Sequence, residues 1–259
     1  MTKSSSIQGN RIPRVRRTDQ VVEEIKGWVV RHDLQSGSRL PQERELMATL
    51  DCSRGTIREA LKILEYQGIV RIVPGFGGGA QIAGVSCEHA KDFLRNYFYF
   101  QPTTWESVYK IREQLEPIVA EEVVGILSAD DIQALERTLV LCEQGIAGEI
   151  SPSEHRRAEL EFHSILARSC SDPMLSFFAE FINDLLRDFA EHRNVIEPQQ
   201  SDFAAAALHY HRQLVQAYKD VDAERVRQLM TDHIHDAKCI VSSAEGLVDR
   251  NYLLRRRQP

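Results

Sequence analysis

The chain has 259 residues, of which 42% are hydrophobic and 27% are charged, and its formal net charge is −6. This length accommodates two domains with separate cores. No apolar run approaches the roughly 20 residues of a membrane helix, and the N-terminus lacks the apolar core of a signal peptide, so we expect a cytoplasmic protein that does not span a membrane. The five cysteines are scattered without Cys-x-x-Cys spacing, which argues against a zinc ribbon or a dithiol redox site.

Charge is distributed unevenly along the chain. Residues 1–84 hold 13 Lys and Arg against 9 Asp and Glu, whereas residues 85–259 hold 19 against 29. The basic N-terminal part is suited to contact with nucleic-acid phosphates, whereas the acidic remainder is expected to have a different function. We therefore expect a disordered basic arm, a DNA-binding domain, an all-helical domain and a basic tail, over residues 1–17, 18–84, 85–247 and 248–259. The arm either adds phosphate contacts or is a solubilising tail.

A helix-turn-helix is predicted between residues 40 and 70. A short amphipathic helix over Glu43–Leu50 precedes a tight turn at Asp51 and Cys52, and a second helix begins at Ser53, a favourable N-cap. Arg54 and Arg58 lie one turn apart on the face opposite the apolar stripe of that second helix. The stripe consists of Ile57, Ala60, Leu61 and Leu64. This pattern is typical of a recognition helix, and a merely solvated helix with two exposed arginines is the alternative.

The following segment favours the recognition helix. Gly68 is predicted to end the helix, and Ile69–Val73 to form a strand. Residues 74–79, Pro-Gly-Phe-Gly-Gly-Gly, predict a turn into a second strand near Gln81–Ala83. A helix-turn-helix followed by a glycine-tipped hairpin is a winged helix, in which the tip glycines allow backbone N–H groups to approach phosphates.

These residues resemble the GntR superfamily of bacterial transcription factors, in which Leu-Pro-Ser-Glu-Arg-Glu-Leu precedes Ser-Arg-x-x-x-Arg-Glu-Ala-Leu. The corresponding stretches here are residues 40–46, Leu-Pro-Gln-Glu-Arg-Glu-Leu, and residues 53–61, Ser-Arg-Gly-Thr-Ile-Arg-Glu-Ala-Leu. The resemblance implies arginines on DNA at Arg44, Arg54 and Arg58, phosphate contacts from Ser53 and Thr56, and a wing around Gly75 and Gly77 in the minor groove. Gln42, Gly55 and Pro74 depart from the family pattern, so the operator sequence does not follow.

The remainder of the chain predicts an all-α domain of about six to seven helices. Glycine and proline become sparse, and capping signals recur at Thr103-x-x-Glu106, at Ser128-x-x-Asp131, and at Ser151 with Ser153. The predicted helices are a leading one near 88–99, then 103–125, 128–145, 151–170, 173–193, 201–218 and 223–247.

Histidines are concentrated in this half, with seven of the nine between residues 155 and 235. Glu159 and His163 lie four residues apart and share one helix face, where they can converge on one cation. His211 and His233 fall on two later helices, and a bundle can bring all four groups together. The alternative is that these histidines are surface residues or satisfied core groups. His209 and His235 face elsewhere, and His155 and His192 have no assigned role.

Residues 105–245 resemble the FadR C-terminal, or FCD, domain, which places the chain in the FadR subfamily. The resemblance rests on residues 108–117, Val-Tyr-Lys-Ile-Arg-Glu-Gln-Leu-Glu-Pro, on residues 159–163, Glu-Leu-Glu-Phe-His, on His211 with Ala217, and on residues 230–233, Met-Thr-Asp-His. It implies a metal held by Glu159, His163, His211 and His233, with Glu in place of the family's Asp. Such ligands suit Zn, Ni or Mn.

By the same resemblance, Arg112 is a candidate anchor for a carboxylate effector, because a guanidinium binds carboxylate in a bidentate way. A surface ion pair between Arg112 and Glu116 is the alternative for this residue.

The resulting hypothesis is a homodimeric transcriptional repressor that binds a palindromic operator in double-stranded DNA. A small organic or sugar acid, held by the metal, would modulate its affinity for DNA. Two alternatives use other features of the chain. One is a metal-dependent enzyme acting on organic acids, although no nucleophile motif or phosphate loop accompanies the histidines. The other is a thiol sensor at Cys52, beside the recognition helix.

Overall fold

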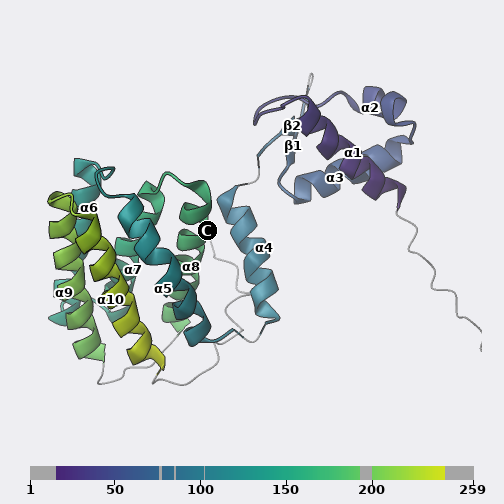
Figure 1. The fold of residues 1–259 in the computed structure, drawn as a ribbon. Helices are drawn as coiled ribbons and strands as arrows, with labels where there is room; N and C mark the ends of the chain where they lie inside the picture. Colours follow the sequence, from purple (N-terminus) through teal and green to yellow (C-terminus); the bar gives the residue numbers. More distant parts are fainter. Residues whose placement is uncertain (1–15, 76–77, 85, 102, 193–199, 243–259) are drawn as a thin grey trace, which may run out of the picture. The chain divides into compact units, whose positions relative to one another are not determined.

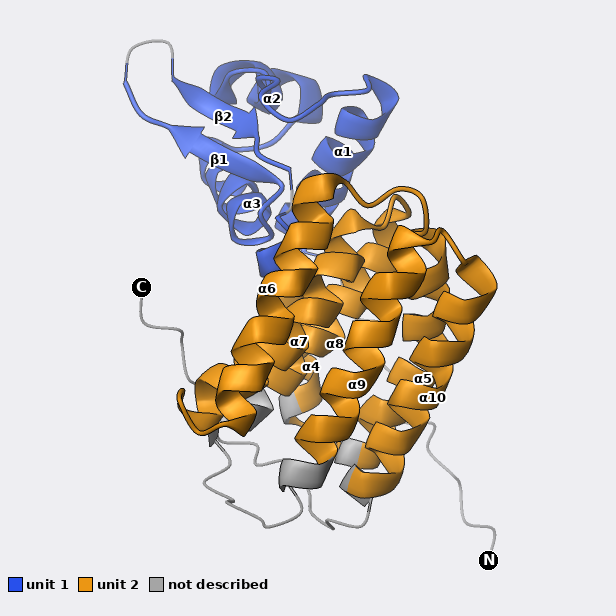
Figure 2. Cartoon of the chain, turned by 90° about the vertical axis from the view of Figure 1, so that its left-hand side faces the viewer, with its two compact units in different colours: residues 1–90 blue, residues 91–259 orange. Residues whose placement is uncertain are grey.

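Two units make up the chain in the computed structural model, residues 1–90 and residues 91–259 (Figure 2). The structure describes residues 16–75, 78–84, 86–101, 103–192 and 200–242. The predicted basic tail, Gly77 and nearly all of the predicted N-terminal arm lie outside these ranges. The division between the units falls inside helix α4 (Cys87–Tyr99), which carries the chain from the first unit into the second.

The first unit contains three helices and a two-stranded antiparallel hairpin (Figure 1). Their bounds are α1 Arg17–Arg31, α2 Glu43–Leu50, α3 Arg54–Tyr66, β1 Val70–Val73 and β2 Gly79–Ile82. The strands pair in a register that sets Val70 opposite Ile82 and Val73 opposite Gly79. The predicted winged helix is confirmed, although its second strand begins earlier than the expected Gln81.

Helix α1 completes the core of this unit. Val21, Val22 and Ile25 face the buried stripe of α3, together with Leu46 from α2. Arg17, which the sequence placed in the disordered arm, is instead the first residue of α1. Its guanidinium donates to the backbone oxygen of Leu50 at 2.8 Å and so satisfies a carbonyl at the end of α2. Arg17 therefore belongs to the first unit, and residues 1–15 of the predicted arm lie outside the described residues.

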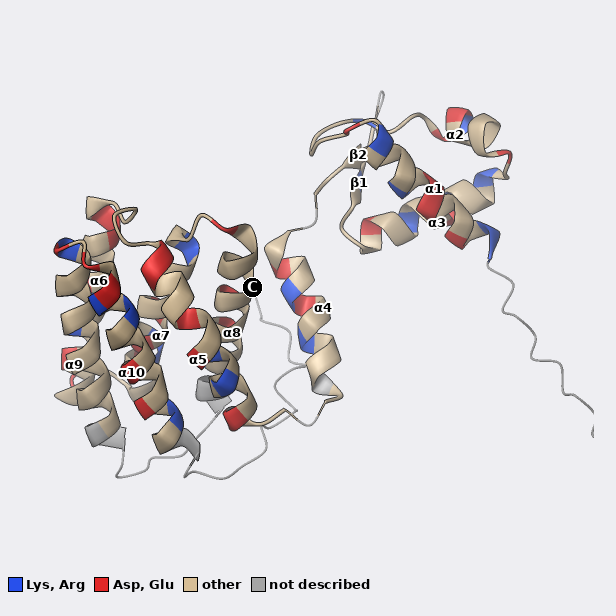
Figure 3. Ribbon diagram, viewed as in Figure 1, with Lys and Arg blue, Asp and Glu red and all other residues tan. Residues whose placement is uncertain are grey.

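The second unit is built from helices alone in its described residues, which confirms the predicted mainly α fold class. After α4 come α5 Trp105–Glu122, α6 Ala129–Ile146, α7 Pro152–Ser169, α8 Pro173–His192, α9 Gln200–Lys219 and α10 Ala223–Ser242. Acidic residues recur along these helices (Figure 3). None of the described helices is both long and apolar enough to cross a bilayer.

The capping predictions hold for two helices and fail for one. Ser128 and Ser151 cap α6 and α7, each accepting a backbone hydrogen bond from the residue three positions later. Helix α5 is capped by Thr104, not by Thr103, because Thr104 Oγ1 accepts from the backbone N–H of Ser107. Adjacent threonines offer the same chemistry, so the sequence alone does not distinguish them.

The helices of the second unit enclose one large apolar core, in which α7 lies between α6 and α8 and α10 lies against α5 and α9. Phe162, Leu166, Leu214, Met230 and Ile234 are among its most deeply buried side chains. Buried polar residues interrupt this core on α5, α7, α9 and α10. These interruptions require an explanation, because burying a polar group costs free energy unless it finds a partner.

Gly145 on α6 lies against His155 on α7. A Cβ atom added there would lie 2.4 Å from the His155 ring. We expect Gly145→Ala to lower the free energy of unfolding by about 1–3 kcal/mol, the usual cost of overpacking. In a His155→Gly background, which removes both the ring and the Cβ atom that would collide, the same change should instead stabilise by up to about 1 kcal/mol, because alanine favours a helix interior over glycine. Chemical denaturation of the four proteins tests this reversal of sign, and equal effects in both backgrounds would contradict it.

Candidate metal centre and nucleic-acid interface

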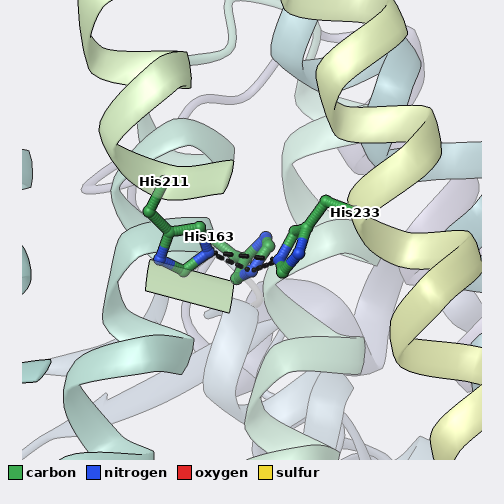
Figure 4. Close-up of side chains that lie close together, drawn as sticks. All are labelled: His163, His211 and His233. Carbon is green, nitrogen blue, oxygen red and sulfur yellow. Dashed lines mark hydrogen bonds between the residues drawn. The ribbon is translucent and has the colours of Figure 1, made fainter. Parts of the chain in front are cut away.

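Three histidines from three helices converge in the core of the second unit (Figure 4). His163 lies on α7, His211 on α9 and His233 on α10, and all three are buried. Their Nε2 atoms form a triangle, 3.3 Å from His163 to His211, 3.3 Å from His163 to His233 and 3.2 Å from His211 to His233. The resemblance to the FCD domain implied this grouping together with Glu159, and a bundle of helices allows it.

The imidazoles cannot satisfy one another by hydrogen bonding. His163 Nδ1 lies 2.6 Å from the Glu116 carboxylate, so Nδ1 carries the proton and Nε2 presents a lone pair. His211 and His233 could each donate one Nε2 proton to His163, but neither Nε2 would then have a lone pair to accept a hydrogen bond from the other. One cation in contact with three lone pairs resolves this conflict. Three ligands about 2.0–2.1 Å from a tetrahedral zinc ion lie about 3.3 Å apart, so the residues present fit such an ion.

Burial keeps these rings in the form that can bind a cation. Burial, reinforced by the nearby His163 and Arg112, lowers the pKa of His211 well below its usual value. Burial, followed by the effects of the other two histidines, likewise lowers the pKa of His233 well below its usual value. Both rings are therefore neutral near pH 7. A neutral imidazole with a free lone pair is the metal-binding form of histidine.

A buried carboxylate on α5 orients the first of the three rings. Glu116 Oε2 faces His163, and Glu116 Oε1 accepts from Arg112 Nε at 2.5 Å. Burial raises the pKa of Glu116, but the charges of Arg112 and His163 outweigh that effect and hold its pKa far below the usual range. A carboxylate beside the outer nitrogen of a metal-binding histidine favours the tautomer with the proton on that nitrogen and orients the ring.

The second ring is oriented by stacking. His211 lies parallel to the fully buried ring of Phe162, with centroids 3.9 Å apart and planes 4° apart. Its Nδ1 atom is buried without a hydrogen-bond partner among the described residues. Packing therefore substitutes for the outer hydrogen bond that usually holds a histidine ligand.

Glu159, the predicted fourth ligand, lies outside the group of ligand atoms that lie within 4.8 Å of one another. Its Oε2 atom accepts from Arg156 Nη1 at 2.9 Å, and its Oε1 atom is buried without a hydrogen-bond partner. The i, i+4 spacing predicted that the Glu159 carboxylate would face the same site as His163. Arg156, one turn earlier on α7, binds this carboxylate instead. Ligation by Glu159 stays a prediction.

Arg112 does not occupy the surface position considered for it. The ion pair with Glu116 forms as that alternative expected, but both side chains are buried, and the guanidinium carbon also lies 4.9 Å from the centre of the Tyr109 ring. The spacing of Arg112 and Glu116 matches the apolar stripe of α5, which includes Val108 and Val119. That coincidence is the signal that could have identified Glu116 from sequence.

The remaining histidines lie elsewhere, as predicted for two of them. His209 Nε2 contacts Gln213, and His235 Nδ1 contacts Glu113. Both histidine side chains are exposed. His155 is packed against Gly145. His192 ends α8, but its side chain lies outside the described set.

In the first unit, the recognition helix has the predicted orientation relative to its core. Ser53 Oγ accepts from the backbone N–H of Thr56 at 3.2 Å and caps α3. The side chains of Arg54 and Arg58 are 67% and 66% exposed, on the face opposite the buried stripe. Arg44 is exposed on α2. Cys52 is half-buried against the core, as expected of a structural turn cysteine.

Two side chains at the start of α2 organise this surface. Glu43 lies 3.4 Å from Arg58 Nε and 3.8 Å from Arg54 Nε, so one carboxylate holds both guanidinium groups near each other. Gln42, a departure from the family's serine, donates from Nε2 to the backbone oxygen of Gly78 at 3.2 Å. A serine is too short for that contact. Gln42 therefore connects α2 to the base of the wing, where Gly75 has a φ of 101°.

Family models match both units. The model for bacterial regulatory proteins of the gntR family matches residues 17–78, and the FCD domain model matches residues 107–236. The chain belongs to the GntR family of regulators that carry an FCD domain. It is a DNA-binding, ligand-responsive transcriptional regulator and not an enzyme. Regulators of this kind bind operator DNA, bind small-molecule effectors through the FCD domain, and often associate with metal there.

Individual relatives agree with this assignment. The chain is 23% identical over 240 residues to the HTH-type transcriptional repressor NanR of an Enterobacter species, covering 90% of this chain and 88% of the relative. It is 28% identical over 253 residues to the putative HTH-type transcriptional regulator RmpR of Mycobacterium gastri, covering 91% and 86%. A solved GntR structure from Streptococcus agalactiae shares the fold, with a TM-score of 0.58, 23% identity and coverage of 86% and 99%.

Glu116→Gln tests the buried ion pair directly. We expect a loss of about 3–5 kcal/mol in the free energy of unfolding, because Arg112 would remain buried without a countercharge. Since folding depresses the pKa of Glu116, the wild-type advantage should be full at neutral pH and should shrink as the pH falls below about 4.5. Denaturant unfolding at several pH values measures both effects. Glu121→Gln, which alters an exposed carboxylate on the same helix, is the control and should cost at most about 1 kcal/mol.

Proposed function

We propose that this protein is a homodimeric repressor that binds a palindromic operator and is modulated by a small carboxylate, which is held at a divalent metal in the FCD domain. The metal is Zn, Ni or Mn, and the protein acts in the cytoplasm. The buried triangle of imidazole nitrogens is the observation that supports a metal site. The two exposed arginines of α3 are the observation that supports sequence-specific binding of DNA.

The DNA-binding role follows from charge and geometry on α3. Two guanidinium groups one turn apart can reach guanine edges in a major groove, and each bidentate contact discriminates by about 1–3 kcal/mol. Glu43 restrains both groups before binding, which lowers the entropic cost of ordering long side chains on DNA. Ser53 and Thr56 lie at the positive end of the helix, where phosphate is favoured. Arg44 and the wing around Gly75 and Gly77 complete the proposed contact set.

A dimer follows from the size of this surface. One recognition helix covers a single half-site, and two helices related by a twofold axis read a palindrome with the affinity that regulation requires. Similarity to relatives such as NanR, which is named as a transcriptional repressor, supports repression as the outcome. Release of the operator by an effector would then lead to expression of the regulated gene.

The effector site is proposed around the histidine triangle. His163, His211 and His233 would hold the ion, with Glu159 as the further ligand. When bound, the metal supplies positive charge and open coordination positions for an organic anion. Arg112 has five N–H donors. Glu116 accepts from Nε and Tyr109 is a second hydrogen-bond partner of the guanidinium, so the donors that these two contacts leave over are suited to a carboxylate. Glu116 keeps His163 in the tautomer that presents Nε2.

Arg54→Ala and Arg58→Ala test the reading surface. Duplexes selected from a random pool by the wild-type protein serve as the operator probe. Each substitution should weaken binding to the selected duplex at least about tenfold while leaving thermal stability unchanged, because both side chains are exposed. The control is Arg137→Ala, which removes an exposed arginine from α6. Retained specificity in both α3 variants would contradict the recognition-helix assignment.

His211→Ala tests the metal site against a histidine two residues away. Wild-type protein, stripped with chelator, should bind one Zn²⁺ per chain and gain thermal stability, because an ion that binds only the folded state stabilises it. His211→Ala should lose this binding, while His209→Ala should keep it. A panel of hydroxy acids and sugar acids is then screened by thermal shift with and without Zn²⁺. Zn²⁺ binding to His211→Ala with wild-type affinity would contradict the site.

A further inference from the structure

The segment that leads into helix α2 pairs with the wing, the β1–β2 hairpin of the same unit. The backbone N–H of Leu40 donates to the backbone oxygen of Ala80 at 2.9 Å, and that of Gly37 donates to the oxygen of Ile82 at 2.8 Å. Residues 37–40 therefore run antiparallel to β2 and toward the point where β2 begins. Helix α2 starts just beyond the end of this pairing.

The backbone alone cannot extend this pairing past Leu40. Pro41 has no N–H to donate. In the same register Gln42 lies opposite Gly78, as Leu40 lies opposite Ala80, but the backbone N–H of Gln42 donates to Glu45 Oε2 at 3.1 Å at the start of α2. The carbonyl of Gly78 thus receives no backbone hydrogen bond from this segment.

The side chain of Gln42 replaces the missing backbone bond. Its Nε2 atom donates to the backbone oxygen of Gly78 at 3.2 Å, and a Cβ atom added at Gly79 would lie 3.4 Å from the same nitrogen. The backbone N–H of Gly78 donates to the oxygen of Gly75 at 2.9 Å. Both backbone groups of Gly78 are therefore held, and the start of β2 is fixed relative to the start of α2.

The residues after Gln42 belong to the surface that reads DNA. Glu43 follows it directly and lies 3.4 Å from Arg58 Nε and 3.8 Å from Arg54 Nε, and Arg44 is exposed on the next position. One short segment thus restrains two parts of the proposed contact set. The carboxylate of Glu43 restrains the guanidinium groups of α3, and the amide of Gln42 restrains the wing.

We propose that Gln42 is a positioning residue for DNA binding, which holds the wing at a fixed offset from α2 and α3 so that the wing and the recognition helix meet neighbouring grooves together. The inference rests on the proposed contact of the wing with DNA. A wing that is held before binding loses less conformational entropy in the complex. A serine at this position would cap α2 but would leave the carbonyl of Gly78 to water, so that the wing is ordered only when DNA binds.

Two substitutions remove this hydrogen bond in different ways. Gln42→Ser shortens the side chain but keeps a favourable N-cap for α2. Gln42→Met keeps the length and removes the donor without adding charge. The matched control is Gln35→Met, since the amide of Gln35 is also exposed in the first unit but donates to Asp33 Oδ1 at 2.8 Å and not to the wing. All three variants should retain the thermal stability of the wild type, because the amides that they remove are exposed.

The test uses the full-length protein and the duplex selected by the wild type. Methylation protection of guanine N7 reports contacts in the major groove, and hydroxyl-radical protection of the sugars reports contacts in the minor groove. Both Gln42 variants should keep the guanine protection, show weaker minor-groove protection beside it, and bind roughly threefold to tenfold more weakly, the effect of one hydrogen bond. Gln35→Met should match the wild type in all three measurements.

Three outcomes would overturn the positioning role. One is a wild-type affinity and footprint in both Gln42 variants. The second is an equal loss of guanine and minor-groove protection, because a general weakening of the unit would produce it. The third is a wild-type protein that protects guanines but no sugars of the minor groove. That result would show that the proposed wing contact itself is wrong, and it is distinguished from the other two by the wild-type footprint alone.

Discussion

Three imidazoles meet in a buried core in a triangle that no arrangement of their protons can satisfy, and the polar residues around them follow from this constraint. The Nε2 atoms of His163, His211 and His233 lie 3.2–3.3 Å apart, and the proton of His163 is committed to Glu116 on its other side. Without a cation, at least one of these contacts sets two lone pairs or two protons against each other. The ionised Glu116 and its partner Arg112 then follow as the support that keeps the first ring in place.

The two units use charge in opposite ways. In the second unit, Arg112 is buried and its countercharge is fixed, so its role is to hold a neighbour in position. In the first unit, Arg54 and Arg58 are exposed and share the single carboxylate of Glu43 at 3.4–3.8 Å, a distance at which solvent screens most of the attraction. Such a contact restrains the guanidinium groups but is readily exchanged for a stronger partner. A surface that must bind phosphate and base edges requires this second arrangement.

Much of this could be predicted from the sequence, and the exceptions share a cause. Helical spacing identified the recognition helix and the seven later helices, because these features are set by periodicity within a segment. The grouping of His163, His211 and His233, together with Glu159, rested on the resemblance to the FCD domain. Spacing within α5 could place Glu116 on the buried stripe, but its pairing with His163 depends on which helix that stripe faces, which spacing does not determine. The direction of the Glu159 carboxylate depends on Arg156, a competing neighbour that a ligand motif does not include.

The segment between the two units is where this protein goes beyond what the family models describe. The models match residues 17–78 and 107–236, so the reading arginines and the histidine triangle lie in matched segments, whereas α4 lies between the two matches. On α4, Lys91 Nζ lies 3.0 Å from Glu180 Oε2 and 3.0 Å from Asp184 Oδ2 of α8. Moving this buried charge out of its carboxylate pair costs far more than sliding the Phe98 ring along that of Phe181, so the ion pairs fix α4 against α8 more firmly than the apolar contact alone.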